Sequence, residues 1–192
     1  MGRVADLRFV SAEAFLDWEG RQPDKHEYIR GEVYAMTGAS QAHVVVTGNL
    51  FVALSQHLKG TRCRVYLPDM KLRIASLEIY FYPDLKVSCD ERDLAADLAI
   101  EHPLVIAEVL SDSTADLDRG TKLQAYRRIA ALQEYLLIDP EQRTVELYRR
   151  NPDETWLLVD YSSKQRLELR SVEASLPVAV LFEGLTTPPP NS

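Results

Sequence analysis

Cysteine is scarce in this chain. The two that occur, Cys63 and Cys89, form no Cys-x-x-Cys pair and no cluster with histidine. This pattern argues against a zinc site, because structural zinc is usually held by four closely spaced cysteine and histidine ligands. Both cysteines lie in runs typical of strands, so we expect small buried hydrophobic side chains.

Long apolar runs are also missing. No run approaches the ~20 apolar residues that a membrane-spanning helix needs. The first ten residues contain two arginines and one aspartate in place of the apolar centre of a signal peptide. We therefore expect a cytoplasmic protein with no membrane partner.

Positive charge is in the minority. The chain has 22 lysines and arginines against 29 aspartates and glutamates, which gives a formal net charge of −7. A protein that coats nucleic acid without specificity needs a strongly positive field, so the net charge argues against that class. A nuclease is compatible with this charge, because carboxylates that bind metal are themselves negative. Its contacts with nucleic acid must then be local and basic.

Hydrophobic periodicity and turn residues predict an α/β protein. The length of 192 residues suits one domain, which we place at residues 1–187, followed by a disordered tail at 188–192. Ser11 and Ser40 are placed to cap helices that reach residue 18 and about residue 58. A third helix is predicted over residues 114–129, capped by Thr114 or Asp116.

Strand patterns fill the intervals between these helices. A hairpin is predicted on either side of Arg30 and Gly31, and a second one at residues 145–160. Other strand-like runs lie at residues 64–74, at 78–89 with an interruption at Pro83, at 104–110 and at 134–138. The run at 104–110 is almost entirely apolar, which predicts a central strand buried on both faces.

Glu108 is the exception within that apolar run. A carboxylate in a buried strand is unfavourable unless a partner neutralises it or it holds a metal, and the sequence alone leaves both possibilities open. Asp84 follows Pro83, and period-two alternation puts it on one strand face with Lys86 and Ser88. Taken alone, Asp84 could equally be an ordinary aspartate at the start of a strand.

Lys122 lies at the edge of the apolar stripe of its predicted helix, four residues before Tyr126. Such a lysine can lay its aliphatic stem on a sheet and bring its ammonium group to a carboxylate, or it can simply be a surface side chain. Two carboxylates and one ammonium together suit phosphodiester hydrolysis. Mg²⁺ takes one or two carboxylates plus waters, and a nearby lysine can orient the attacking water or stabilise developing charge.

The order of these residues resembles the PD-(D/E)XK nuclease superfamily and, more closely, the Uma-two type of restriction endonuclease, also called domain of unknown function 820. The resemblance covers about residues 10–183. The matching stretches are residues 26–32, 42–43, 82–84, 107–114, 118–126 and 134–140. The resemblance implies a restriction-endonuclease-like core, with a mixed sheet flanked by helices and extra N-terminal and C-terminal hairpins. It also implies a metal-dependent endonuclease acting on DNA.

By this resemblance, Asp84 and Glu108 would be metal ligands for Mg²⁺ or Mn²⁺, with the Val109 carbonyl as a third oxygen. Lys122 would be the catalytic lysine, because Leu110 stands where the superfamily typically has lysine. Lys86 stays open as a substitute acid–base group or as a charge partner of Asp84. Further candidates for accessory roles are Glu27, Glu32 and His43, although ordinary salt bridges or structural roles would also explain them.

Arg119, Arg127 and Arg73 are candidates for contacts with the phosphate backbone, unless they are simply solvated. The expected partners are double-stranded DNA and a second copy of the chain, since two copies can cut two strands. One alternative is an inactive nuclease-like fold that binds nucleic acid or protein. Another is a homo-oligomeric structural protein that pairs through the aromatic strand at residues 80–82.

Overall fold

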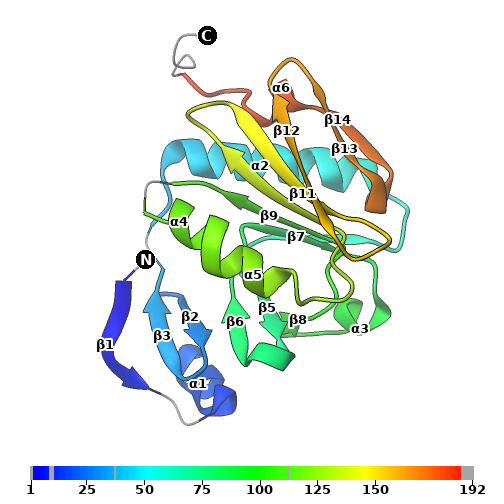
Figure 1. Cartoon of the computed structure of the whole chain (residues 1–192). Coiled ribbons are helices and arrows are strands. Elements are labelled where there is room, and N and C mark those ends of the chain that lie inside the picture. The colour runs from blue at the N-terminus through cyan, green and yellow to red at the C-terminus, as the bar shows by residue number, and fades with distance from the viewer. Residues whose placement is uncertain (1, 9–10, 37, 112, 187–192) are drawn as a thin grey trace.

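The computed structural model describes residues 2–8, 11–36, 38–111 and 113–186, and side chains from residue 11 onward within these ranges. Two six-stranded sheets form the framework (Figure 1). The tail predicted at residues 188–192 lies outside the described residues. No helix in the described ranges has the length and apolar character to cross a membrane.

The first sheet is mixed and lies beside helix α1 (Ala12–Glu19), which Ser11 caps by accepting a hydrogen bond from the Ala14 amide. Phe15 of this helix packs on Tyr28 and Val33 of the sheet. The predicted hairpin turn at Arg30 and Gly31 is confirmed. In spatial order the strands are β1 (Gly2–Arg8), β3 (Glu32–Ala35), β2 (His26–Ile29), β6 (Ile79–Phe81), β5 (Lys71–Ile74) and β8 (Ala99–Ile100).

The second sheet is also mixed, as predicted, and contains the expected C-terminal hairpin of β11 and β12. Its central strand β9 runs parallel to β10 and antiparallel to β7, and every residue of β9 is buried. In spatial order the strands are β12 (Trp156–Ser162), β11 (Thr144–Arg150), β10 (Glu134–Asp139), β9 (Val105–Val109), β7 (Leu85–Ser88) and β4 (Arg64–Tyr66).

Helices cover both faces of the second sheet (Figure 1). Helix α2 (Gln41–His57), capped by Ser40, packs on one face together with the hairpin of β13 (Arg166–Leu169) and β14 (Ala174–Pro177) and with helix α6 (Val178–Leu181). The other face packs against helix α5 (Leu123–Tyr126) and against residues of the first sheet. Short helical turns lie at α3 (Glu91–Leu94), Ala75–Leu77 and Arg170–Val172.

Two segments predicted as single strands each divide between the two sheets. Residues 64–74 form β4 and β5, with a turn at Leu67–Met70 between them. Residues 78–89 form β6 and β7, which are separated by Pro83. Proline cannot donate to a strand ladder, and Pro68 and Pro83 stand where the chain leaves one sheet for the other. The chain therefore crosses between the sheets immediately before Asp84.

The helix predicted over residues 114–129 is shorter and irregular. It begins as α4 (Ala115–Leu117), widens into a π-helical turn (Asp118–Lys122) and ends with α5 at Tyr126. The side chain of Thr114 makes no capping hydrogen bond. Single π turns inside α-helices occur often at functional sites, and Lys122 is the last residue of this one.

Two expectations are wrong. Cys63 and Cys89 form a disulfide bond, because the pairing of β4 with β7 sets Arg64 opposite Ser88 and so brings the flanking cysteines together. The aromatic strand at residues 80–82 is buried, with side chains at most 5% exposed, and β6 lies between β2 and β5. That strand is therefore not free to pair across a two-fold axis.

Candidate active site

Asp84 and Glu108 lie side by side where the chain crosses between the sheets, and each carboxylate accepts a hydrogen bond from the backbone near the other residue. The Val109 amide donates to Asp84 Oδ2 over 2.7 Å, and the Asp84 amide donates to Glu108 Oε2 over 3.2 Å. Both residues are buried, at 8% and 3% exposure. Because each carboxylate accepts a hydrogen bond from the backbone at or beside the other, the two are held as neighbours.

Glu108 faces the helix that carries Lys122. Along β9, Val105, Ala107 and Val109 point into the core under α2, so alternation turns Glu108 to the opposite face. There its Oε1 atom accepts from Lys122 Nζ at 3.0 Å and from the Tyr126 hydroxyl at 2.6 Å. Lys122 and Tyr126 are four residues apart and lie on one helix face.

Lys122 is surrounded by carboxylates. Besides Glu108, its ammonium lies 3.2 Å from Glu27 Oε1 and 3.3 Å from Asp118 Oδ1. Glu27 comes from β2, which makes it the contribution of the first sheet to the site, and it is fully buried. Asp118 had not been singled out from the sequence, although its position four residues before Lys122 was a readable signal for an ion pair.

His43 completes the group from the start of α2. Its Nε2 atom lies 2.9 Å from Asp84 Oδ1, on the side of the carboxylate away from Val109. Burial alone would lower the pKa of His43, but the hydrogen bond and charge of Asp84 raise it above the ordinary histidine value. The geometry makes His43 a partner that fixes the orientation of Asp84.

Carboxyl groups outnumber the single ammonium group in the cluster. Lys122 faces three carboxylates, and burial raises the pKa of Glu108 to about 8 despite the opposing effect of Lys122. Burial raises the pKa of Asp118 as well. Burial would lower the pKa of Lys122, yet Glu108, Glu27 and Asp118 raise it well above the usual value. The site therefore holds its protons tightly and favours additional positive charge.

These side chains line one pocket of about 910 Å³ that reaches the surface. The volume lies within the range of ~300–1,000 Å³ that is usual for ligand sites. The pocket brings together the predicted residues Asp84, Glu108, Lys122, Glu27 and His43 with the unpredicted Asp118.

Comparison with known proteins identifies the family of this chain. Residues 12–181 match the Uma2 family, described as "Putative restriction endonuclease". The chain belongs to the Uma2 family. It is 40% identical over 176 residues to the uncharacterized protein slr1290 of Synechocystis sp., covering 92% of this chain and 93% of that one. A second Synechocystis protein, sll1609, also uncharacterized, is 38% identical over 159 residues, covering 82% and 90%.

A solved structure has the same fold as this Uma2 chain. It is the crystal structure of "a putative nuclease belonging to DUF820" from Anabaena variabilis. The TM-score is 0.71 at 20% sequence identity, and the match covers 91% of this chain and 98% of the other. The predicted fold class and the predicted family are both confirmed.

The donor set of this Uma2 site fits a hard divalent cation. Mg²⁺ takes oxygen ligands and needs only one or two carboxylates beside its waters, and Asp84 and Glu108 provide two neighbouring ones. Glu27 Oε2 is buried without a hydrogen-bond partner among the described residues, so a further oxygen is unsatisfied there. The described residues contain no ready-made group of three or more His, Cys, Asp or Glu side chains that could hold a metal.

Two predicted accessory residues lie outside this group of interacting side chains. Glu32 accepts a hydrogen bond from the Tyr34 hydroxyl in the first sheet. Lys86 is fully buried and donates to the carbonyl oxygens of Leu67, Met70 and Pro83. Burial lowers the pKa of Lys86 to about 7. Lys86 therefore links the turn at Leu67–Met70 to Pro83, where the chain crosses between the sheets. All three N–H groups of its ammonium are already engaged.

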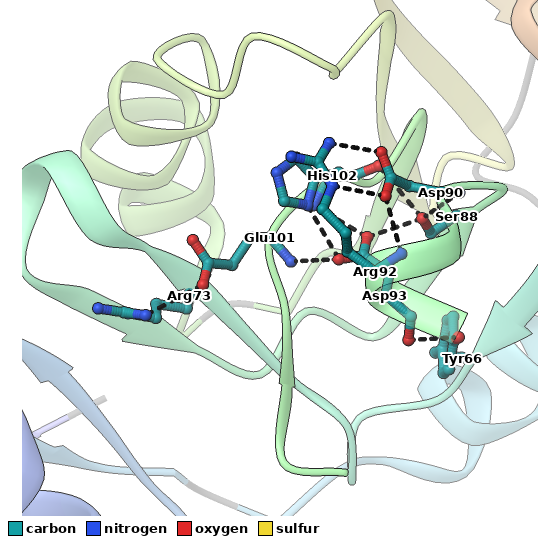
Figure 2. Close-up of polar contacts among 8 residues, drawn as sticks. All are labelled: Tyr66, Arg73, Ser88, Asp90, Arg92, Asp93, Glu101 and His102. Atoms are coloured by element: carbon teal, nitrogen blue, oxygen red, sulfur yellow. Dashed lines mark hydrogen bonds and ion pairs between the residues drawn. The ribbon is translucent and has the colours of Figure 1, made fainter. Parts of the chain in front are cut away.

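The three predicted phosphate-contact arginines are also elsewhere, and none belongs to the described pocket lining. Arg119 pairs with Glu146, and Arg127 lies 5.8 Å from the ring centre of Trp156. Arg73 pairs with Glu101 at 3.0 Å, and both side chains are labelled in Figure 2. Their contact with nucleic acid remains a prediction.

A second buried polar cluster surrounds Asp93, near the end of β7 (Figure 2). Asp93 Oδ2 accepts from the Ser88 hydroxyl at 2.7 Å and from the His102 amide at 2.9 Å. Asp93 Oδ1 accepts from the Glu101 amide at 2.9 Å and contacts His102 Nδ1 at 3.1 Å. Serine, aspartate and histidine meet here, but the Ser88 hydroxyl donates to Asp93 and to the backbone carbonyl of His102 and not to the imidazole ring. The arrangement contains no serine activated by a base.

Proposed function

We propose that this chain is a metal-dependent endonuclease that hydrolyses DNA phosphodiester bonds at Asp84, Glu108 and Lys122. The observation that carries the proposal is the Lys122 ammonium, 3.0 Å from Glu108 in a pocket shared with Asp84. The helix supplies a lysine at the carboxylates although the strand has Leu110 in the usual lysine position. Membership of the Uma2 family supports nuclease chemistry in general.

In this proposal Asp84 and Glu108 hold a divalent cation, Mg²⁺ or Mn²⁺, with the Val109 carbonyl as a further oxygen. Such an ion supplies Lewis acidity and makes water a stronger nucleophile at neutral pH. Lys122 orients the attacking water and stabilises the charge that develops on the phosphoryl oxygens. Glu27, Asp118 and Tyr126 keep this lysine and Glu108 in position, and His43 keeps Asp84 oriented.

The test is cleavage of plasmid and linear duplex DNA with Mg²⁺ or Mn²⁺, comparing wild type with Lys122→Met. The variant should lose at least about 10²-fold in rate, since a charge-stabilising donor at a reaction centre is worth that much. Lys164→Met removes an exposed lysine outside the described pocket lining and should cut like wild type. Equal cleavage by both variants would refute the role of Lys122.

Double-stranded DNA is the proposed substrate, and a homodimer is the proposed form, because two sites are needed to cut two strands in one encounter. Sedimentation at increasing protein concentration, with and without a duplex oligonucleotide, checks this part. A monomer on the duplex that only nicks one strand would contradict it.

One observation favours a second candidate, a nuclease-like fold used for binding. Lys122 already pairs with Glu108, and no group of three metal-ligating side chains is preassembled in the described residues. A Glu108→Ala variant that still binds nucleic acid or protein as wild type does would support this function. Metal binding lost in Asp84→Ala would support the enzyme.

A further inference from the structure

Strand β12 forms an open edge of the second sheet. Among the described strands it pairs with β11 alone, over seven residue pairs without a register shift. The ladder continues from a turn in which the Asn151 amide donates to the Thr155 carbonyl. Because antiparallel pairs alternate, residues 157, 159 and 161 turn their backbone groups to β11, and Trp156, Leu158 and Asp160 turn theirs outward. These outward groups are available to a further strand.

The other sheet edges in the described part of the chain are less suited to pairing. Strand β8 has two residues and β4 has three, and β4 is fastened beside β7 by the Cys63–Cys89 disulfide. The pairing of β1 with β3 has a register shift. By contrast, β12 has seven residues, contains no proline and carries one charged residue, Asp160. Monomeric proteins usually block long, regular edges of this kind, because such edges pair with other chains.

Apolar side chains are exposed on both faces of this edge. Leu157 and Leu158 are 49% and 45% exposed, and alternation puts them on opposite faces of the sheet. A single exposed leucine is ordinary on a protein surface. Two that lie on opposite faces of one edge are covered together only by a strand that extends the sheet.

The sequence of β12 matches a second copy of itself. In an antiparallel pair of identical strands centred on Leu158, this residue lies opposite its own copy and Trp156 lies opposite Asp160. Every outward backbone group of these residues then meets a partner. On the alternate positions Leu157 lies opposite Val159, so apolar side chains meet apolar side chains.

The neighbouring registers fit less well. Centring the pair on Asp160 would set two carboxylates opposite each other, which is destabilising. Centring it on Val159 would require the backbone of Ser162, whose amide and carbonyl are already bonded to Gln165. The register centred on Leu158 is therefore the one that the free groups favour.

Opposite charges at the two ends of β12 favour the same arrangement. Glu154 lies in the turn before the strand and Lys164 in the turn after it, and both are exposed. A two-fold axis at Leu158 brings Glu154 of each copy opposite Ser162 of the other, two residues from Lys164, a diagonal distance that long side chains span. The axis repeats this attraction at both ends of the interface. This charge pattern favours a second, antiparallel copy as the occupant of the edge.

We propose that two copies of this chain join through β12, antiparallel about Leu158, to form one continuous sheet. The two-fold axis is then perpendicular to the sheet, so both copies turn the face that carries Glu108 to the same side. This arrangement suits two sites that act on one duplex. The inference rests on the proposed function for the existence of a homodimer and adds the surface that forms it.

The test is sedimentation velocity at increasing protein concentration, without DNA or metal. Wild type should form a dimer. Leu158→Asp sets two carboxylates opposite each other at the axis and should raise the dimer Kd by at least about 100-fold. The control is Leu98→Asp, the same change at an exposed leucine just before β8 in the first sheet, which should sediment as wild type.

An exchange of charges tests the register. Glu154→Lys and Lys164→Glu should each raise the dimer Kd about threefold or more at low salt, because each places like charges together at both ends of the interface. The double variant should return the Kd to within about twofold of wild type. Within one chain the two residues lie at opposite ends of an extended strand, roughly 30 Å apart, so rescue requires contact between copies.

A wild-type monomer at every concentration would overturn both this inference and the proposed homodimer. A dimer that Leu158→Asp leaves intact would overturn the β12 interface alone. If Leu158→Asp fails to fold, as judged by circular dichroism, the charge exchange decides, and single charge variants that dimerise as wild type would overturn the inference. A β12 dimer that cuts no DNA would refute the nuclease function and leave the interface standing.

Discussion

The Asp93 cluster and the pocket cluster are both buried groups of charged side chains, but they differ in how fully their atoms are satisfied. Both oxygens of Asp93 accept two contacts each, from Ser88, Glu101 and His102. In the pocket, one ammonium faces three carboxylates, and Glu27 Oε2 has no partner among the described residues. A saturated cluster stabilises the fold, whereas an unsaturated cluster retains the capacity to bind something else.

The two buried lysines show the same contrast. Lys86 donates to three carbonyl oxygens, and burial lowers its pKa to about 7. Lys122 faces carboxylates that raise its pKa well above the ordinary value, against the effect of burial. The two lysines share residue type and burial, so it is their surroundings, backbone carbonyls for one and carboxylates for the other, that move their pKa values in opposite directions.

The largest expected effect concerns the pocket cluster. Glu108→Gln keeps the shape of the side chain but removes a charge, so DNA cleavage should fall by about 10³-fold or more. The Tm should change little, because the loss of one carboxylate beside Lys122 offsets the loss of the acceptor for the Asp84 amide. The control is Glu91→Gln, an exposed position in α3. If Glu108→Gln unfolded at a lower temperature but kept its cleavage rate, the pocket cluster would be the structural one, contrary to the comparison with the Asp93 cluster.

The next effect concerns the Asp93 cluster. Asp93→Asn replaces an acceptor of four contacts with a group that must donate at one side, so unfolding free energy should fall by about 2–4 kcal/mol. Urea denaturation measures this loss. The cleavage rate per folded molecule should be unchanged, and a specific loss of activity would place Asp93 with the functional residues.

Removing the disulfide should have an effect of similar or smaller size. Cys63→Ser, or reduction by dithiothreitol, opens a cross-link between residues 26 apart in the sequence, which should lower stability by about 3–4 kcal/mol. Because Cys89 adjoins the Asp93 cluster and not the pocket, activity should not depend on the redox state. An activity that responds to reductant without a change in Tm would contradict this.

The smallest effect is a dependence of stability on pH. Burial raises the folded-state pKa of Glu108 to about 8, against about 4.3 in the unfolded chain. The unfolded state loses this proton first, so the contribution of Glu108 is fully present below pH ~4.3 and is lost as pH rises through ~8. Relative to Glu108→Gln, wild type should lose stability progressively as pH rises over that window. Parallel stability curves for the two proteins would contradict the argument.

Local patterns in the sequence were sufficient to predict several elements. The caps at Ser11 and Ser40, the turn at Arg30 and Gly31, and the buried strand around Glu108 are all confirmed. Each depends on a cap, a turn or a periodicity within a few residues. The division of residues 64–74 between two sheets was not predictable in this way, because alternation gives the faces of a strand but not the sheet to which it pairs.

The candidate site also combines features that local sequence patterns indicate with contacts that only the fold creates. The sequence by itself determined the chemical types: a carboxylate that needed a partner in a buried strand, an aspartate after Pro83 and a lysine on an apolar helix face. Only the tertiary structure decided that Glu27, His43 and Asp118 join them, that Lys86 and Glu32 do not, and that the cysteines meet. Apart from the four-residue spacing of Asp118 and Lys122, those contacts join elements tens of residues apart, so they follow from packing and pairing, which no local pattern encodes.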